Sequence, residues 1–399
     1  MSISKRISSI NPSVTLGITA KAKQMKQEGI DVVGFGAGEP DFDTSGHIKE
    51  AAKDALDSGF TKYTPTSGIR ELKEAICWKF KEDNRLDYFQ EEVLVSCGAK
   101  HSIFNAILAL CEEGDEVILP SPYWVSYPEM VKLTGAKLVI VETTEGNNFK
   151  ITEEQLKRVI SSKSKLLILN SPSNPTGMVY TKDELVPISN ILMEDNIFCI
   201  SDEIYEKLIY DGVEHVSIAS LGKRIKNLTV VVNGVSKSYS MTGWRIGYAA
   251  GQKEVIQAMS NLQDHSTSNP TSISQYAAVE AIRGSQEDLK RMVEEFKKRR
   301  DYMVEKINSI KGLGVVRPQG AFYCFVNIKS LLGKYFESTL IKDSLTLTDL
   351  LLTKSRVAVV PGCVFGDDNY IRLSYATSLE NIVKGFERIE EFTLDTLHD

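Results

Sequence analysis

The segment TVVVNGVSKSYSMTGWRIGY, residues 229–248, decides the fold class. Residues 229–232 are all β-branched, and such a run without alternation is typical of a strand buried in a parallel sheet. Comparable runs lie earlier in the chain at residues 93–96, 116–119, 138–141, 166–169 and 198–201. Amphipathic stretches, predicted as helices at 100–111 and near 127–133, separate some of these strands. Strands alternating with helices predict a doubly wound, mostly parallel α/β sheet.

The pattern changes after about residue 284. The sequence predicts a long charged helix at 286–310, a final helix at 379–397, and short strands at 320–326, 356–360 and 370–374. These elements are typical of a smaller α+β lobe. We expect an N-terminal arm with part of the small lobe at 1–45, a large lobe at 46–284 and a small C-terminal lobe at 285–399. The first 35 or so residues either pack on the small lobe or reach a neighbouring subunit.

The composition argues against several classes of protein. The 399 residues carry a formal net charge of −6, which gives no electrostatic reason to expect a nucleic-acid partner. Residues 1–6 lack the apolar core of a signal peptide, and no apolar run is long enough to span a membrane. The six cysteines form no C-x-x-C pair, which predicts reduced thiols and a cytoplasmic location. The five histidines lack metal-ligand spacing, so no metal site is predicted.

The loop that follows residue 232 contains a candidate nucleophile. Lys237 stands among small and apolar residues, and Schiff-base chemistry needs an amine that loses its proton near neutral pH. Arg245 follows and could supply both a nearby cation and a bidentate grip on a phosphate. A lysine in such a loop is by itself more often an exposed surface residue, so the assignment depends on the other motifs.

Polar side chains also follow two other predicted strands. Asp202 closes the run at 198–201, and the carboxyl end of a parallel strand faces the crevice where ligands bind. Asn174 lies in the loop NSPSNPTG, residues 170–177, whose prolines make a stiff platform for a side-chain amide. Each has a simpler alternative, since Asp202 could cap a helix and Asn174 could be an ordinary turn residue.

Two weaker signals and one misleading motif complete the set. Gly98 and Ala99 connect a strand to a helix, and free N–H groups at such a helix start suit a phosphate. Arg372 in the alternating segment YIRLSYA, residues 370–376, could bind a carboxylate, although a lone strand arginine is more often only exposed. The segment VVGFGAG, residues 32–38, looks like a dinucleotide loop, but EPDFD follows where a helix should start.

As a set, these motifs resemble the class I aminotransferases of pyridoxal-phosphate fold type I, and most closely the bacterial aspartate aminotransferases of the Ib subgroup. The resemblance extends from Arg6 to about Glu391. It rests on motifs that occur in the family's order: AGEPDF (37–42), YTPTSG (63–68), SPYWVSY (121–127), NSPSNPTG (170–177), SDEIY (201–205), MTGWRIGY (241–248), PQGAFY (318–323) and RLSYA (372–376).

The resemblance implies pyridoxal 5′-phosphate as the cofactor, held in the large lobe. Lys237 would bind it covalently and then move the substrate proton, while Asp202 would pair with the pyridine nitrogen. Tyr205 and Asn174 would hold the phenolic oxygen, and Trp124 would stack on the ring. The implied phosphate ligands are Gly98, Ala99, Lys100, Ser236 and Arg245, with Tyr63 from the other subunit of a homodimer. Ser236 is the least secure of them, because Gly234 stands where related enzymes of another subgroup carry a serine.

The resemblance also implies the substrate contacts. Arg372, assisted by the backbone of Gly38, would clamp the α-carboxylate, Lys100 would bind a distal carboxylate, and Trp124 and Asn174 would line the same space. The implied reaction moves an amino group from L-aspartate or L-glutamate to a 2-oxo acid such as 2-oxoglutarate or oxaloacetate.

Several alternatives stay open from the sequence. Transamination of prephenate or of aromatic amino acids, and another fold type I reaction such as C–S lysis, would use the same cofactor. A non-catalytic regulator usually carries an N-terminal DNA-binding domain, whereas this sequence starts at the arm. A plain nucleotide-binding α/β protein would bind no such cofactor.

Overall fold

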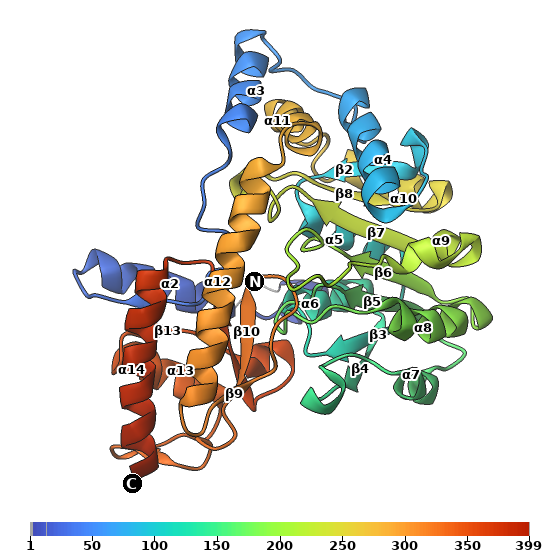
Figure 1. Ribbon diagram of the computed structural model, residues 1–399. Coiled ribbons are helices and arrows are strands. Elements are labelled where there is room, and N and C mark those ends of the chain that lie inside the picture. Colours follow the sequence, from blue (N-terminus) through green and yellow to red (C-terminus); the bar gives the residue numbers. More distant parts are fainter. Residues whose placement is uncertain (1–2, 13, 399) are drawn as a thin grey trace.

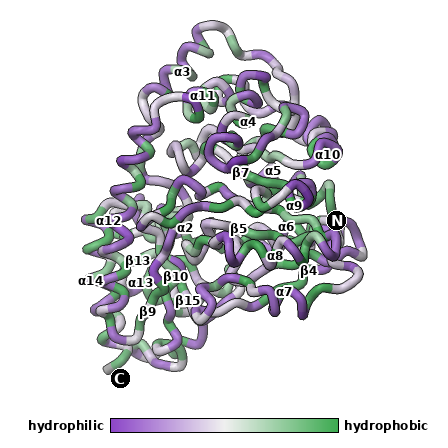
Figure 2. Tube along the Cα trace, turned by 45° about the vertical axis from the view of Figure 1, so that its right-hand side comes forward, coloured by the Kyte–Doolittle hydropathy of each residue, from purple (hydrophilic) through white to green (hydrophobic). Residues whose placement is uncertain are grey.

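The computed structural model describes residues 3–12 and 14–398. Figure 1 shows two lobes side by side: a large lobe around the main β-sheet on the right, and a smaller lobe of orange and red elements at the lower left. Helix α12 (Glu287–Ser309) runs along the smaller lobe and extends toward the top of the large one. Figure 2 shows hydrophobic residues along interior strands and hydrophilic residues on outer helices such as α3 (Gly46–Asp57).

The main sheet has seven strands in the order β2, β8, β7, β6, β5, β3, β4. Their bounds are β2 (Val93–Ser96), β3 (Glu116–Ser121), β4 (Lys137–Glu142), β5 (Ser164–Asn170), β6 (Phe198–Asp202), β7 (Thr229–Gly234) and β8 (Gly247–Ala250). All neighbours are parallel except β8, which is antiparallel to β2 and β7. The predicted α/β class is confirmed. β8 was not predicted, because its sequence GYAA is poor in β-branched residues.

The register of this sheet brings the loops that follow β5, β6 and β7 to one edge. Asn170 at the end of β5 lies opposite Asp202 at the end of β6, and Asp202 lies opposite Val232 in β7. The loop with Lys237 begins immediately after β7. Three segments far apart in the sequence therefore meet at the carboxyl ends of parallel strands, where α/β proteins bind ligands.

Helices cover both faces of the main sheet. Helices α5 (Ala99–Leu110) and α10 (Lys253–Asp264) bury Ile103, Ile107 and Met259 against strand residues such as Val230. On the other face, α8 (Lys182–Glu194) and α9 (Lys223–Leu228) pack on Leu167. The remaining helices of this lobe are α4 (Arg70–Asn84), α6 (Ser126–Thr134), α7 (Glu153–Val159) and α11 (Ser272–Arg283).

The small lobe is built on a four-stranded antiparallel sheet in the order β14, β15, β10, β9. The predicted run 356–360 is divided between β13 and β14, and the predicted strand 320–326 begins only at Tyr323. The bounds are β9 (Gly314–Val315), β10 (Tyr323–Asn327), β11 (Tyr335–Phe336), β12 (Thr339–Leu340), β13 (Val357–Ala358), β14 (Val360–Pro361), β15 (Tyr370–Ser374), α13 (Ser344–Thr353) and α14 (Leu379–His398). The predicted helices 286–310 and 379–397 are confirmed as α12 and α14.

From α2 (Val14–Gln27) onward the N-terminal segment packs on the small lobe, whereas α1 (Lys5–Ser8) lies against α6 of the large lobe and Asn11 bonds Glu129 there. The segment also contains β1 (Val33–Gly34), which pairs with β13 in parallel. Ala22 and Val32 are buried against Leu352 and Ala358. The domain boundaries after residues 45 and 284 stay a prediction. Within the described residues, no helix has both the length and the apolar character needed to cross a bilayer.

Candidate active site

Lys237 is a half-buried amine with a lowered pKa. Its Nζ donates a hydrogen bond to the carbonyl oxygen of Gly38 at 2.5 Å. The pKa of Lys237 is lowered to about 8, mainly by burial and also by Arg245 and Arg372, while Glu39 and Asp202 oppose this shift. A substantial fraction of this amine is therefore neutral near physiological pH, as a nucleophilic lysine requires.

Asp202 is a buried carboxylate at the end of β6, with 4% of its surface exposed. The hydroxyl of Tyr127 donates to Oδ2 at 2.7 Å, and the N–H of Ile204 donates to Oδ1 at 3.2 Å. Burial raises the pKa of Asp202 to about 6, and these two hydrogen bonds oppose that rise. The carboxylate is thus charged at neutral pH although it is cut off from water.

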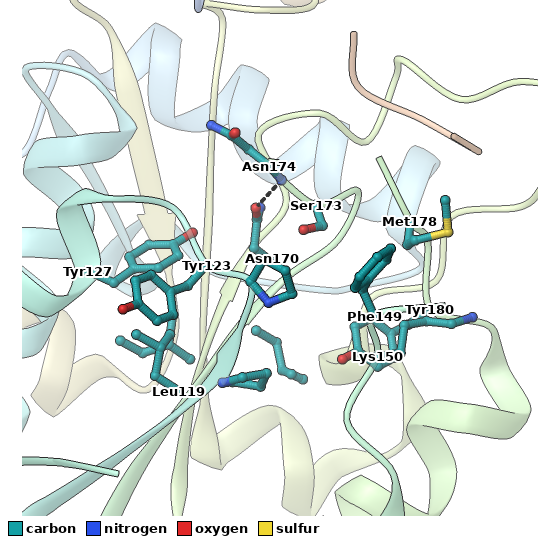
Figure 3. A pocket seen from close by; sticks show the side chains of 14 residues that line it. Leu119, Tyr123, Tyr127, Phe149, Lys150, Asn170, Ser173, Asn174, Met178 and Tyr180 are labelled. Atoms are coloured by element: carbon teal, nitrogen blue, oxygen red, sulfur yellow. Dashed lines mark hydrogen bonds between the residues drawn. The ribbon is translucent and has the colours of Figure 1, made fainter. Parts of the chain in front are cut away.

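The loop after β5 is held to the strand that carries Asp202. Asn170 donates from Nδ2 to the backbone carbonyl of Asp202 at 3.0 Å, and its Oδ1 accepts the N–H of Asn174 at 2.8 Å (Figure 3). Asn174 is itself buried, and its Oδ1 accepts a hydrogen bond from Nη1 of Arg372 at 3.1 Å. This loop therefore connects the large lobe to the arginine of β15.

Arg372 is a buried cation without a carboxylate partner. It is 3% exposed, and its Nη2 donates to the carbonyl oxygen of Gly36 at 3.0 Å. Its guanidinium lies 4.4 Å from the ring centre of Tyr323 and 5.1 Å from that of Phe365. Its Nε has no hydrogen-bond partner, and no carboxylate of the described residues lies within ion-pair distance. Burying an unpaired charge is costly, so this arrangement suits a ligand that brings its own negative charge.

Tyr205 and Tyr323 join the two lobes at the site. Their hydroxyl groups lie 2.9 Å apart, and both side chains are buried. Tyr205 follows β6, whereas Tyr323 begins β10 of the small lobe. Tyr323 therefore contacts two predicted residues: its hydroxyl pairs with that of Tyr205, and its ring lies under the guanidinium of Arg372.

The turn before α5 packs closely against Arg245 and β8. Gly98 has a φ of +94°, and a Cβ built there would lie 2.5 Å from Nη2 of Arg245. A Cβ on Gly247 would lie 2.0 Å from the backbone nitrogen of Ala99, so both positions need glycine. Lys100 places its Nζ 4.9 Å from the ring centre of Trp124, and burial together with the charge of Arg245 lowers its pKa. Two cations and a helix N-terminus thus converge, as phosphate sites require.

Arg245 is held in position by neutral groups. Its Nη1 donates to the carbonyl oxygen of Thr242 at 2.8 Å, and its Nη2 donates to that of Cys97 at 3.1 Å. Among the residues that the structure describes, neither Arg245 nor Lys100 forms an ion pair. Ser236 is buried beside Lys237. Tyr63 is not brought to this group: it is 92% exposed and has no hydrogen bond or ring contact with the other predicted residues of the described chain.

Comparisons with known proteins agree with this geometry. A sequence profile described as aminotransferase class I and II matches residues 30–389. An aspartate aminotransferase of Bacillus sp. (strain YM-2) is 52% identical over 390 residues, which cover 98% of each chain. An aspartate/prephenate aminotransferase of Nitrosomonas europaea is 44% identical over 392 residues, 98% of this chain and 99% of that one. The crystal structure of the aspartate aminotransferase from Rhizobium meliloti has a TM-score of 0.95 at 44% identity, covering 98% and 99% of the two chains.

The chain belongs to the class I and II aminotransferases. The resemblance inferred from the sequence is therefore confirmed, as is fold type I.

Three side chains of this aminotransferase contact the predicted site without having been predicted. Tyr127 donates to Asp202, Tyr323 pairs with Tyr205, and Glu39 accepts a hydrogen bond from Thr242 at 2.7 Å. All three lie inside motifs that carried the resemblance. The motifs could have marked them as candidates, but their partners lie far away in the sequence. No helix follows residues 32–38 before α3, as expected from the sequence, and the rejection of a dinucleotide loop there stays a prediction.

A second buried cluster lies beside Asp202 and is not part of the predicted site. Glu203, Glu206 and His215 place possible metal-ligand atoms within 4.8 Å of one another, although their spacing in the sequence gave no such signal. Lys79, however, forms an ion pair with Glu206, and His215 Nε2 lies 3.1 Å from Glu203 Oε2. Burial favours a higher pKa for Glu206, but Lys79 and other nearby cations lower it. Burial favours a lower pKa for His215, but Glu203 raises it. Lys79 and His215 are thus the partners of these two carboxylates in the structure.

Proposed function

We propose that this chain is an aspartate aminotransferase that uses pyridoxal 5′-phosphate. The names of its relatives support the substrate, and the family implies the cofactor. The observation that carries the proposal is geometric: Lys237 follows β7 beside Asp202 of β6, and both Lys237 and the buried Arg372 donate to one segment, at the carbonyl oxygens of Gly38 and Gly36. An amine of lowered pKa, an acid and two arginines that lack carboxylate partners are the groups that this chemistry needs.

The donor set fits the cofactor group by group. The turn at Gly98 and Ala99, Lys100 and Arg245 suit its phosphate, with Ser236 as a further donor beside Lys237. Asp202 suits the ring nitrogen, Tyr205 and Asn174 suit the phenolic oxygen, and Trp124 offers a ring face. The glycine requirement at positions 98 and 247 supports close approach of backbone N–H groups to the phosphate. When bound, the cofactor supplies an aldehyde for the amine and a ring that accepts electrons from the substrate Cα.

The protein's own residues would then act as follows. Lys237 Nζ would take the proton from the substrate Cα and release it on the far side of the amino nitrogen, and its lowered pKa suits both roles. The Asp202 carboxylate keeps a proton on the ring nitrogen. Arg372 binds the α-carboxylate, assisted by the backbone of Gly38, and so fixes the direction of the Cα–H bond. Asn174, already bonded to Arg372, lines the same space.

Lys100 is the proposed contact for the distal carboxylate of aspartate or glutamate. Its cation has no acidic partner among the described residues and lies over Trp124, beside the proposed ring position. The second candidate substrate is prephenate, because a relative at 44% identity is named for both activities. A panel of aspartate, glutamate, phenylalanine and tyrosine with 2-oxoglutarate, oxaloacetate and prephenate separates the two.

Tyr63 leads us to propose a homodimer with shared sites. A tyrosine that is 92% exposed and is implied in phosphate binding can act only at another subunit's site. Mixing Lys237→Ala chains with Tyr63→Ala chains tests this. Mixed dimers would hold one intact site, so a 1:1 mixture should recover about one quarter of wild-type activity. No recovery above the separate variants, with mixed dimers shown to form, would contradict it. The cytoplasmic location stays a prediction.

The central experiment is spectroscopic. The purified protein with pyridoxal 5′-phosphate should show the visible absorbance of the bound cofactor, which aspartate should bleach and 2-oxoglutarate should restore. Lys237→Ala should abolish covalent capture, shown by borohydride reduction and mass analysis. Lys132→Ala, which removes a half-buried lysine paired with Glu129 on α6, is the matched control and should behave as wild type. A wild-type protein that takes up no cofactor would refute the proposed function.

A further inference from the structure

Tyr127 contacts both groups that flank the proposed cofactor ring. It lies in the first turn of α6, is 1% exposed, and donates its hydroxyl hydrogen to Asp202 at 2.7 Å. Its ring meets that of Trp124 edge to face, with centres 5.3 Å apart at 83°. Its backbone N–H bonds the carbonyl oxygen of Trp124 at 3.1 Å. One helix turn thus fixes the stacking side chain and the acid relative to each other.

Among the described residues, Asp202 is the hydrogen-bond partner of the Tyr127 hydroxyl. Figure 3 shows Tyr127 and Tyr123 on the left of a small pocket, Asn170 and Asn174 near its centre, and Phe149, Lys150 and Tyr180 on the right. Leu119 and Ile168 also line this pocket, which has room for about 20 Å³. A buried hydroxyl needs a partner, and here the partner is a buried carboxylate. The contact is therefore a charge-assisted hydrogen bond shielded from water, the stronger kind.

We propose that Tyr127 is a positioning residue that keeps the Asp202 carboxylate ionised and aimed at the cofactor ring nitrogen. This inference rests on the proposed function. Asp202 has two hydrogen-bond donors in the described structure, the Tyr127 hydroxyl and the N–H of Ile204. The Ile204 bond is longer, at 3.2 Å, and reaches the other oxygen. Without the Tyr127 hydroxyl, Oδ2 would be buried with no protein donor, which favours protonation.

Tyr127→Phe removes this one hydroxyl and keeps the ring that packs on Trp124. Tyr123→Phe is the matched control, since it makes the same change in the same pocket and Tyr123 has no hydrogen bond to Asp202. Two quantities are measured on the apoproteins: the dissociation constant of pyridoxal 5′-phosphate from absorbance titration, and its dependence on pH. The kcat with aspartate is a third measurement.

Affinity should fall as the pH drops through the pKa of Asp202, because only the charged carboxylate holds the ring proton. In wild type and in Tyr123→Phe that midpoint should lie near pH 6. In Tyr127→Phe it should lie about one unit higher, with cofactor binding at pH 7 weaker by roughly 10-fold or more. A general loss of packing would weaken binding at every pH without moving the midpoint.

The outcomes separate the two proposals. If the wild type binds no cofactor, the proposed function fails. If it binds and Tyr127→Phe has the midpoint and affinity of Tyr123→Phe, the proposed role of Tyr127 fails. Should Tyr127→Phe not fold, the same change is made in Asp202→Asn. If that double variant folds, the hydroxyl is needed only where residue 202 is charged, and the inference is supported. If the double variant also fails to fold, the inference is overturned.

Discussion

Arg372→Met should abolish efficient turnover while leaving the fold almost as stable as before. The arginine is buried, its guanidinium hydrogen-bonds only neutral oxygens, and its Nε is unpaired in the described chain. Replacing a buried, unpaired charge by an apolar side chain removes a desolvation cost of several kcal/mol. It also removes two hydrogen bonds and the contacts with the rings of Tyr323 and Phe365, which stabilise by a similar sum. The net change in unfolding free energy should therefore lie within about 1 kcal/mol of zero.

The effect on catalysis should be far larger. Removing one partner of a buried, hydrogen-bonded charge pair costs about 2–5 kcal/mol, and the α-carboxylate would be the other partner of Arg372. That range corresponds to a fall in kcat/KM of about 30- to 5,000-fold. For amines without an α-carboxylate, kcat/KM should change little, because they form no ion pair with Arg372.

Lys79→Met should, unlike Arg372→Met, strongly destabilise the fold. Lys79 and Glu206 are 3% and 4% exposed and form an ion pair, so the variant strands a buried carboxylate. We expect a loss of about 3–5 kcal/mol in unfolding free energy, measured by urea denaturation. The cofactor-free forms should be compared, because ligand binding adds stability of its own. Equal destabilisation by Arg372→Met and Lys79→Met would refute the reasoning, because the arginine would then be a structural residue.

Three further predictions concern the proposed cofactor and substrate contacts. The rate at which the apoprotein captures pyridoxal 5′-phosphate should rise with pH to a plateau, with a midpoint near 8, because only neutral Lys237 attacks. If burial did not lower this pKa, stopped-flow absorbance would show a rate that still rises steeply above about pH 9, without a plateau. Lys100→Ala should raise KM for aspartate more than for phenylalanine, and equal changes would restrict Lys100 to the phosphate. Asp202→Asn should still bind the cofactor, although more weakly, and should lose on the order of 3–5 kcal/mol of transition-state stabilisation, judged from kcat/KM, whereas full activity would remove the role of its charge.

The sequence predicted the elements better than the contacts between them. Hydrophobic periodicity located β5, β6 and β7, and parallel pairing then brought Asn170, Asp202 and Lys237 to one edge. It missed β8, which lacks β-branched residues and depends on pairing with β7 and β2 for its conformation. Local pattern is informative where the side chains themselves favour a conformation, and uninformative where neighbours impose it.

Tyr127 and Tyr323 show the same limit at the site. Their partners Asp202 and Tyr205 lie 75 and 118 residues away in the sequence. No period or spacing connects residues at such separations, and a tyrosine in an apolar segment is usually only part of the core. The fold had to be known before their hydroxyl groups could be seen to point at the site.

Charge balance gives the most general argument for a doubly anionic cofactor and a dicarboxylate substrate. Buried cations elsewhere in the described chain have acidic partners, as Lys79, Lys150, Arg299 and Arg300 do. The buried Arg372 has none among the described residues, and neither do Arg245 and Lys100, whose side chains are exposed. A phosphate brings a charge of about −2 and a dicarboxylate another −2, against three cations and the partial positive charge at the start of α5. An amino acid with an apolar side chain would leave Lys100 without a partner, so the same balance that admits the phosphate favours aspartate over phenylalanine.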